Sequence, residues 1–483
     1  MPKSMAEAYA YSSMLAELNG RFAPVARPKG ASIDRAASSH MGTKSLIVLA
    51  VAALGFGVWA NWHEMNLAMD ILRRCLLGAI YTGIGQACLF ICISALAWQV
   101  MLASRYRPSP TCSDEQLPMC TVVVPAYNEG RMVLRTLRSI ARSDYPAEKL
   151  QIIAVDDGST DDTWQWIQKA GREFAGIVTI RQPHNAGKKQ AMYDAFHQAT
   201  GDVLVTVDSD SLIEPETLRR LVSPLCHNSR VGAVAGNVRV LNRHEGLIPR
   251  MLEVAFAFSF EFIRSAQSSV RTVFCTPGAL AAYRRSAIMP VLDSWLNQTF
   301  FGQPAKIGED RAITNWILRT GHEVVFQSNA IVYTNVPSRY DDLCKMFLRW
   351  ARSNVRENIM MGRYIFRRFR PSSVAGARAW FILSVFSLLA PHVLLAGATV
   401  CLLWKPGVFF MPMMLGSALC ASVIAGFYAY RHRSSDALWA YAYSFFWTAG
   451  LFWISGYALL TAHNNSWMAR DQKTPSMKIP ASS

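Results

Sequence analysis

A short acidic turn, Ile307-Gly-Glu-Asp-Arg311, carries the residue types best suited to chemistry in this chain. An aspartate at this place can act as a general base that takes a proton from an attacking hydroxyl group. We therefore predict that Asp310, with Glu309 beside it, is catalytic. The alternative is a structural aspartate that pairs with the neighbouring Arg311.

A basic-aromatic pair, Arg349-Trp350, follows about forty residues later. A guanidinium group can pair with a diphosphate, and an indole ring offers a flat apolar face against which a sugar ring can stack. A tryptophan in a basic amphipathic helix is otherwise an anchor at a membrane surface. Together with the acidic turn, the pair favours transfer of a sugar from a diphosphate leaving group.

Two further acidic clusters each follow a β-branched apolar run. Asp156-Asp157 comes after Gln151–Val155, and Asp208-Ser-Asp210 comes after Val203–Val207. Two carboxylates at this spacing can hold Mg²⁺ or Mn²⁺ against a diphosphate, because these hard cations prefer oxygen ligands. One base with a metal-held leaving group favours a single displacement with inversion, whereas two flanking carboxylates without a metal are typical of glycosidases. The alternative for Asp208 and Asp210 is a solvated acidic turn.

The candidate nucleotide contacts lie at the ends of the first two predicted strands and at the start of a helix. Pro125-Ala-Tyr-Asn-Glu129 closes the first strand, so Ala126, Tyr127 and Glu129 are candidates, and Asp157 closes the second. A carboxylate there can accept hydrogen bonds from a uracil edge or ribose hydroxyls, although Asp-Gly-Ser-Thr is also ordinary turn chemistry. Lys188, near a helix N-terminus, suits an anionic ligand; the alternative is a solvated surface lysine.

Short apolar strands and helical patterns alternate from Thr121 to about Ser338. This order predicts an α/β domain with a mostly parallel sheet and right-handed crossovers. In such a sheet, functional side chains lie at the carboxyl ends of the strands. Both aspartate clusters fall at such ends, so we expect them to meet at one edge.

Long uncharged stretches flank this region, and we expect the chain to be a multi-pass protein of the cell membrane with a cytosolic catalytic domain. The predicted organisation is a flexible cytosolic tail (1–40), two transmembrane helices (41–107), the catalytic domain (108–338), interfacial amphipathic helices that carry Arg349-Trp350 (339–378), C-terminal transmembrane helices (379–462) and a C-terminal tail (463–483).

The C-terminal part contains three uncharged stretches, Ala379–Trp404, Pro406–Tyr430 and Ala437–Ala462. Three crossings would place the C-terminus opposite the cytosolic domain, yet Trp467–Arg470 and Lys473 are typical of cytosolic residues. We therefore expect one stretch to be re-entrant or interfacial, and the sequence leaves open which one.

The composition narrows the possible partners. The formal charge is +16, and many basic residues lie beside apolar stretches. Attraction to a membrane surface explains this excess better than nucleic acid, so we expect a lipid bilayer and no nucleic acid as a partner. The ten cysteines include no CxxC pair, so neither a disulfide framework nor a structural zinc site is indicated.

Together the motifs resemble the family 2 processive glycosyltransferases with a GT-A fold, most of all hyaluronan synthases, with some features of nodulation-type chitin-oligosaccharide synthases. The matching segments, in order, are Gly187–Phe196, Asn297–Phe300, Gly308–Asn315, Gln327-Ser328, Val336-Pro337, Arg349–Ser353 and Arg356-Glu357. The resemblance implies UDP-sugar donors, a growing polysaccharide as acceptor, and export of the chain.

The resemblance also implies residue roles. Residues that match Asp157 and Lys188 bind the nucleotide, and the match to Asp210 holds the metal, with Asp208 beside it. Asp310 corresponds to the base and Trp350 to an acceptor platform. Gly278 resembles a loop near the acceptor, and Trp467–Arg470 is similar to a gating motif in which Arg470 closes over UDP.

Several positions depart from the family pattern. Met346 stands where a glutamine is expected, Phe347 replaces a second frequent glutamine, Glu309 replaces an aspartate, and Ala469 replaces a threonine. We first expect a hyaluronan-type product from UDP-GlcNAc and UDP-glucuronate. The alternatives are a single-sugar β-polysaccharide synthase (chitin-like or poly-N-acetylglucosamine), a lipid-phosphate glycosyltransferase and a catalytically degenerate membrane scaffold.

Overall fold

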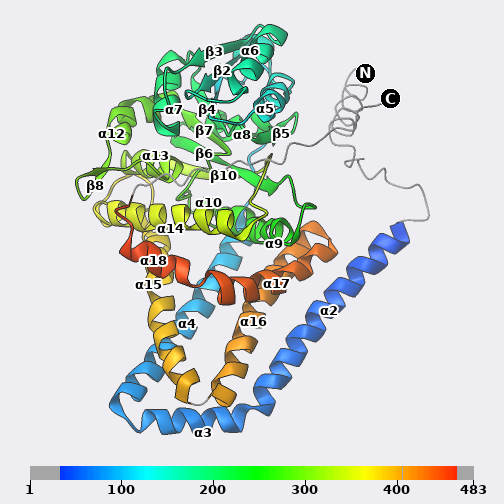
Figure 1. Cartoon of the computed structure of the whole chain (residues 1–483), viewed down its shortest axis with the longest axis vertical. Helices are drawn as coiled ribbons and strands as arrows, with labels where there is room; N and C mark the ends of the chain where they lie inside the picture. The colour runs from blue at the N-terminus through cyan, green and yellow to red at the C-terminus, as the bar shows by residue number, and fades with distance from the viewer. Residues whose placement is uncertain (1–32, 405, 465–483) are drawn as a thin grey trace.

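The computed structural model describes residues 33–404 and 406–464. A globular α/β domain lies at one end and a group of long apolar helices at the other (Figure 1). Three helices lie across the boundary between them, namely α14 (Tyr340–Gly362), α17 (Trp439–Phe446) and α18 (Trp453–Leu460). The predicted gating motif with Arg470 lies outside the described residues. The helix α2 begins at Ile33, inside the stretch for which the sequence predicts a tail.

The domain is built on an eight-stranded sheet with the order β3-β2-β1-β4-β7-β6-β10-β5. Its strands are β1 (Cys120–Ala126), β2 (Leu150–Asp156), β3 (Ile177–Arg181), β4 (Val203–Val207), β5 (Ser211–Ile213), β6 (Val231–Val240), β7 (Leu280–Arg284) and β10 (Glu323–Thr334). All neighbouring pairs are parallel except those that involve β7 or β5. The predicted α/β fold with a mostly parallel sheet is confirmed.

Helices cover both faces of this sheet, which explains why its central strands are continuous apolar runs. Every residue of β1 and β4 is buried. One face packs against α5 (Met132–Ala141), α6 (Thr163–Glu173) and α8 (Thr217–His227). The other packs against α7 (Lys188–Gln198) and α13 (Glu309–Arg319).

The strand register brings the acidic clusters to one edge. Strands β1 and β2 are parallel and end together, with Ala126 opposite Asp156. Strand β4 runs parallel to β1 on its other side. Asp157 and Asp208 each follow the last residue of their strand, so both lie at the carboxyl edge of the sheet.

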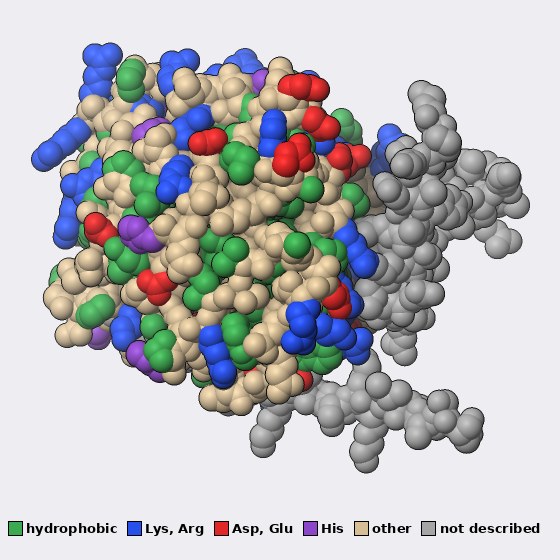
Figure 2. Space-filling model, turned by 90° about the horizontal axis from the view of Figure 1, so that it is seen from above, with side chains coloured by type: hydrophobic (Ala, Val, Ile, Leu, Met, Phe, Trp, Pro, Cys, Tyr) green, Lys and Arg blue, Asp and Glu red, His purple; other side chains and the backbone are tan. Residues whose placement is uncertain are grey.

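Two helical segments connect this edge to the apolar helices. The first runs from α9 (Leu247–Phe256) through a π-helical turn, η2 (Ala257–Ile263), into α10 (Arg264–Ser269). The second is α14 (Tyr340–Gly362), which carries Arg349 and Trp350. Figure 2 views the domain from the end opposite the apolar helices and shows basic and acidic side chains mainly around its rim.

Three of the described helices are long and apolar enough to cross a membrane, namely α4 (Leu76–Arg105), α15 (Ala375–Trp404) and the Met413–His432 part of α16 (Pro406–His432). A fourth span is obtained if α2 (Ile33–Ala60) and α3 (Trp62–Arg73), which meet at 53°, count as one. Their surfaces bear large apolar side chains that no protein covers; Phe90 is 72% exposed and Leu403 is 82% exposed.

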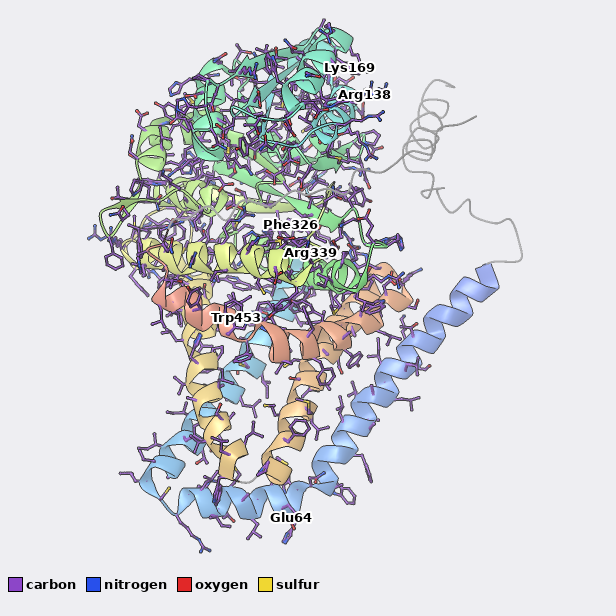
Figure 3. The ribbon with its side chains drawn as sticks, viewed as in Figure 1. Glu64, Arg138, Lys169, Phe326, Arg339 and Trp453 are labelled. Atoms are coloured by element: carbon purple, nitrogen blue, oxygen red, sulfur yellow. The ribbon has the colours of Figure 1, made fainter. Side chains whose placement is uncertain are left out.

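The last uncharged stretch does not form one continuous helix. It is divided into a 3₁₀ turn (Ser435–Leu438), α17 (Trp439–Phe446), a π-helical turn (Trp447–Leu451) and α18 (Trp453–Leu460). Figure 3 places Trp453 at the boundary beside the domain, and Glu64 of α3 at the far end of the apolar helices. Buried residues such as Leu451 pack against the domain. Of the three C-terminal uncharged stretches, Ala437–Ala462 is therefore the one that is broken and lies against the domain, whereas the other two form the continuous helices α15 and α16.

Candidate active site

A cavity of about 2340 Å³ opens at the carboxyl edge of the sheet, between the strand ends and α14. Every described residue that the sequence predicts for the site lines it. These residues are Ala126, Tyr127, Glu129, Asp157, Lys188, Asp208, Asp210, Gly278, Glu309, Asp310, Arg349 and Trp350. Segments more than two hundred residues apart in the chain thus meet around one space large enough for a nucleotide sugar and an acceptor.

Asp157 fixes the loop that leads into α7. Its two carboxylate oxygens accept hydrogen bonds from the backbone N–H groups of Ala186 (2.8 Å) and Gly187 (2.9 Å). Burial raises the pKa of Asp157, while these two hydrogen bonds oppose the shift. The carboxylate therefore holds the start of α7, and with it Lys188, at the edge of the cavity.

Lys188 lies between two carboxylates from different elements. Its ammonium group donates to Asp208 at the end of β4, and its Nζ is 3.2 Å from Oε1 of Glu309 at the start of α13. Burial alone would lower the pKa of Lys188, but Asp208 and Glu309 together raise it above its usual value. Lys188 is therefore a fixed positive charge that joins the acidic cluster after β4 to the acidic turn.

Gly278 makes room for this ion pair. A Cβ atom built at this position would lie 2.8 Å from Nζ of Lys188 and 3.5 Å from Oδ1 of Asp208. Any side chain would push against the lysine. The glycine for which the sequence predicts a loop near the acceptor thus lies directly over the ion pair between Lys188 and Asp208.

The two acids of the turn have opposite electrostatic surroundings. Burial would raise the pKa of Glu309, but Lys188 and Arg349 lower it overall. For Asp310, burial and then the charge of Glu309 raise the pKa. Two neighbouring carboxyl groups with opposite shifts are typical of sites that divide roles between a fixed charge and an acid or base.

Asp310 is held at the first turn of α13. Its Oδ1 accepts from the backbone N–H of Arg311 (2.7 Å), and its Oδ2 accepts a weak hydrogen bond from the Cys275 thiol (3.6 Å). Burial raises the pKa of Cys275 to about 12, so the thiol stays protonated. Within residues 33–404 and 406–464, no Lys, Arg or His lies within 4.0 Å of the Asp310 carboxylate. A carboxylate that faces the cavity with a raised pKa and no such partner suits a general base.

Residues of α14 hold the acidic turn Ile307–Arg311 in place. Gly308 has a left-handed backbone (φ 75°), and a Cβ atom there would overlap the side chain of Ser353. Arg356 donates to the carbonyl oxygen of Ile307. Glu357, also buried, accepts hydrogen bonds from Gln298 (2.7 Å) and Asn315 (3.0 Å).

The basic-aromatic pair forms part of an aromatic surface. Trp350 is 38% exposed, and its ring lies 5.9 Å from that of Phe256, 6.4 Å from Phe260 and 5.7 Å from Phe347. Met346 lines the same cavity. A thioether cannot donate the hydrogen bond that a glutamine amide would supply there.

Lys189 was not singled out from the sequence. It is buried, donates to the carbonyl oxygen of Ala305 (3.2 Å) and lies over the ring of Trp295 at 5.2 Å. Burial lowers its pKa to about 8. The sequence indicated a role for Lys189 only through its position next to Lys188. Nothing in the sequence distinguishes a buried lysine from a solvated one.

Asp208 and Asp210 could hold a divalent cation. Both line the cavity, and Oδ1 of Asp210 accepts from the Thr334 hydroxyl (3.2 Å). Among the described residues, no three His, Cys, Asp or Glu side chains come together as a ligand set. A cation here would take its other ligands from a diphosphate and water, which suits Mg²⁺ or Mn²⁺. The donor set therefore fits the predicted metal.

Comparisons with known proteins show which proteins this chain resembles. Residues 118–353 match a family model described as "Glycosyltransferase like family 2". An N-acetylglucosaminyltransferase of Sinorhizobium fredii is 30% identical over 368 residues, which cover 75% of this chain and 86% of the relative. A hyaluronan synthase of Streptococcus pyogenes is 36% identical over 244 residues, which cover 49% of this chain and 57% of that synthase.

A solved structure shares the fold. It is a mannosyltransferase from Pyrobaculum calidifontis in complex with GDP-Man and Mn²⁺. It is 20% identical, with a TM-score of 0.54, and the match covers 81% of this chain and 99% of that one. At this level of identity the likeness concerns the fold alone.

Proposed function

Because the chain belongs to the family 2 glycosyltransferases, we propose that it is a membrane-bound, inverting and processive polymerase of UDP-sugars. The observation that carries the proposal is the arrangement in one cavity of Lys188 between Asp208 and Glu309, with Asp310 and Trp350 beside them. One side of this cavity suits a diphosphate and the other suits a sugar chain.

Transfer proceeds by single displacement. An acceptor hydroxyl attacks the anomeric carbon of the donor, and Asp310 takes the proton of that hydroxyl. The bond from the anomeric carbon to the diphosphate oxygen breaks, and UDP leaves with the electron pair. Attack opposite the leaving group inverts the anomeric configuration. Glu309 stays ionised and keeps Lys188 in place.

The leaving group is negatively charged, so cations stabilise its departure. Lys188 and Arg349 supply charge from the protein, and a Mg²⁺ or Mn²⁺ ion held by Asp208 and Asp210 would supply more when bound. Asp157, Ala126, Tyr127 and Glu129 border the nucleotide. The gating role of Arg470 remains a proposal from the sequence resemblance.

The acceptor lies on the aromatic surface of α14. Trp350 stacks against its terminal sugar, and Gly278 keeps the loop close to the ion pair. The apolar helices embed the protein in the cell membrane with the domain on the cytosolic side, since the surfaces of α4 and α15 are largely uncovered. The product leaves through the membrane part of the molecule.

The first candidate for the product is a hyaluronan-type copolymer of GlcNAc and glucuronate. The second is a chitin-like polymer of GlcNAc alone. It is favoured by one specific observation, since the match to the N-acetylglucosaminyltransferase of Sinorhizobium fredii spans 86% of that relative, whereas the hyaluronan synthase match spans 57%. Met346 in place of glutamine is compatible with either product.

The test is UDP release and polymer formation by the purified protein in detergent with Mg²⁺ or Mn²⁺. UDP-GlcNAc, UDP-glucuronate or both are supplied. Sustained release with polymer only when both are present supports the copolymerase, and polymer from UDP-GlcNAc alone supports the chitin-like product. The absence of turnover under every condition contradicts the proposed polymerase.

A further inference from the structure

A second cavity of about 590 Å³ lies between the domain and the apolar helices α4 and α15. It adjoins the catalytic cavity, and the two have six lining residues in common. These are Ser259, Arg264, Cys275, Arg311, Asn354 and Ser387. A ligand that extends from the catalytic centre past Asp310 therefore enters this space next. Its volume lies within the range of about 300–1,000 Å³ that is usual for sites of small organic ligands.

Three buried hydrogen-bond donors line this second cavity without an acceptor among the described residues. They are Nη1 of Arg264, Nε of Arg311 and the indole Nε1 of Trp380. Arg264 is 8% exposed and Trp380 is 5% exposed. A buried donor without a partner destabilises the fold by about 1–3 kcal/mol, so such groups are rare unless a ligand satisfies them.

The missing partner must accept hydrogen bonds and carry negative charge. Within the described residues, neither Arg264 nor Arg311 forms an ion pair with a carboxylate closer than 4.0 Å. The Arg264 guanidinium lies 4.0 Å above the ring of Phe260, which leaves its edge for a ligand. Asp310 acts on Arg264 from beyond 4.0 Å, so one carboxylate faces two guanidinium groups. A neutral sugar would satisfy the donors but would leave one of these two positive charges without a counter-charge of its own.

We propose that the second cavity binds a carboxylate-bearing sugar unit, a uronate, of the acceptor chain just beyond the catalytic centre. Arg264 and Arg311 donate to the carboxylate, and Trp380 donates to a ring hydroxyl. This inference rests on the proposed polymerase function and deepens it, because it assigns a uronate-containing chain rather than a neutral one as the acceptor. Trp380 is positioned by Trp98 of α4, whose ring lies 5.3 Å away.

The test is calorimetric titration of the purified full chain in a neutral detergent with two tetrasaccharides. One alternates GlcNAc and glucuronate, and the other is the neutral GlcNAc tetramer. The native chain should bind the uronate-bearing tetrasaccharide at least about tenfold more tightly, since each charge-assisted hydrogen bond is worth that factor or more. Arg264→Gln should remove this preference. Arg172→Gln, which removes an exposed charge on α6, is the matched control and should keep it.

Because Arg264 is buried, Arg264→Gln could fail to fold, and a second variant tests the site independently of it. Trp380→Phe keeps an aromatic ring against Trp98 and removes the N–H, so it should weaken binding of both tetrasaccharides by about fivefold or more while the preference remains. Equal affinities in the native chain, or an unchanged preference in a folded Arg264→Gln protein, would overturn the uronate site. Donor turnover is measured separately. If the protein releases UDP but binds the two tetrasaccharides equally well, only the uronate site is contradicted. If it releases no UDP with any donor, the proposed function itself is contradicted.

Discussion

At the scale of single residues, the division of roles between Glu309 and Asp310 depends on their contacts rather than on their chemistry. Both are carboxylic acids in the first turn of α13. Lys188 lies against Glu309 and keeps it ionised, whereas burial and the charge of Glu309 raise the pKa of Asp310. Of these two acids, Asp310 is therefore the one that combines access to the cavity with a raised pKa.

Replacement of Asp310 by asparagine should lower kcat by about 10²- to 10⁴-fold, because an amide cannot accept the hydroxyl proton. Binding of the UDP-sugar should change little. The checks are UDP release and calorimetric titration with the donor. Near-normal turnover in this variant would remove Asp310 from the role of base.

The raised pKa of Asp310 also predicts a pH profile. The base works only when it has lost its proton. The value of kcat/KM should therefore be low below this pKa and should increase as the pH rises through it. Because the pKa is raised, that increase should occur at a higher pH than for an unperturbed aspartate. A rate that stays flat down to the ordinary aspartate range would contradict the assignment.

The metal proposal is tested at Asp210. Asp210→Asn removes one anionic ligand, so the Mg²⁺ or Mn²⁺ concentration for half-maximal UDP binding should rise at least about tenfold. Glu148→Gln, at an exposed glutamate, is the matched control. If EDTA and Asp210→Asn both leave UDP affinity unchanged, the two aspartates do not hold a metal.

At the scale of elements, the catalytic turn depends on the packing of α13 against α14. Gly308 adopts a left-handed conformation, and only the absence of a side chain there lets Ser353 of α14 pack against the turn that carries Asp310. Strain at such a position costs about 1–3 kcal/mol for residues with a side chain.

Gly308→Ala should therefore lower both the melting temperature and turnover, because it adds backbone strain to an overlap with Ser353. The double change with Ser353→Gly removes the overlap and leaves the strain, so part of the stability should return. Thermal unfolding and UDP release of the two variants provide the measurement. No recovery in the double variant would show that the overlap is not the cause.

A group of charged side chains joins the domain to α16. Glu261, buried in the π-helical turn, forms ion pairs with Arg239 of β6 (3.3 Å) and with Arg431 (2.5 Å) and His432 (3.1 Å) at the end of α16. Burial would raise the pKa of Glu261, but these partners lower it to about 2. The junction therefore depends on an ionised Glu261.

Glu261→Gln should destabilise the protein by about 1–3 kcal/mol at neutral pH, because Arg239 and Arg431 lose a charged hydrogen-bond acceptor. The loss is limited because Arg239 keeps its ion pair with Glu253 (3.2 Å) and Arg431 is half-exposed. The sign of the pH dependence follows from the depressed pKa. The stabilisation is complete above the unfolded value of about 4.5 and is lost as the pH falls through about 2. The difference between native and variant unfolding midpoints should therefore shrink over this window; a constant difference would contradict the linkage.

At the scale of the whole molecule, the broken helix of α17 and α18 decides the topology. If α2 with α3, α4, α15 and α16 each cross the membrane once, as we propose, the chain returns twice to the side of the domain. The hydroxyl of Tyr340 donates to the carbonyl oxygen of Gly450, and Arg352 donates to Thr461 (3.1 Å). These contacts keep the last stretch along the domain.

A reporter fused after Ser483 should accordingly lie on the same side as the domain. Green fluorescent protein placed there should fluoresce, and alkaline phosphatase should be inactive. A fusion after Arg74, at the far end of the apolar helices, is the control and should give the opposite pattern. Phosphatase activity at the C-terminus would mean that the last stretch crosses the membrane.

Much of the fold could be predicted from the sequence because the relevant signals are local. The β-branched run Val203–Val207 coincides with β4, and Gln151–Val155 lies within β2, since burial on both faces of a sheet favours continuous apolar residues. The acidic clusters follow such runs directly. The parallel order of strands then places these acids at one edge without knowledge of any tertiary contact.

The sequence by itself thus determined the α/β class, the strand ends that carry the acids and the apolar stretches, because periodicity and apolar content add up along neighbouring residues. Only the tertiary structure decided that Lys188 pairs with Glu309, that Asp310 has the raised pKa, that the last stretch is broken, and that Arg264 and Trp380 face a second cavity. These properties depend on pairs of residues far apart in the chain. Their energies come from burial, charge separation and close packing, which exist only once the elements have met.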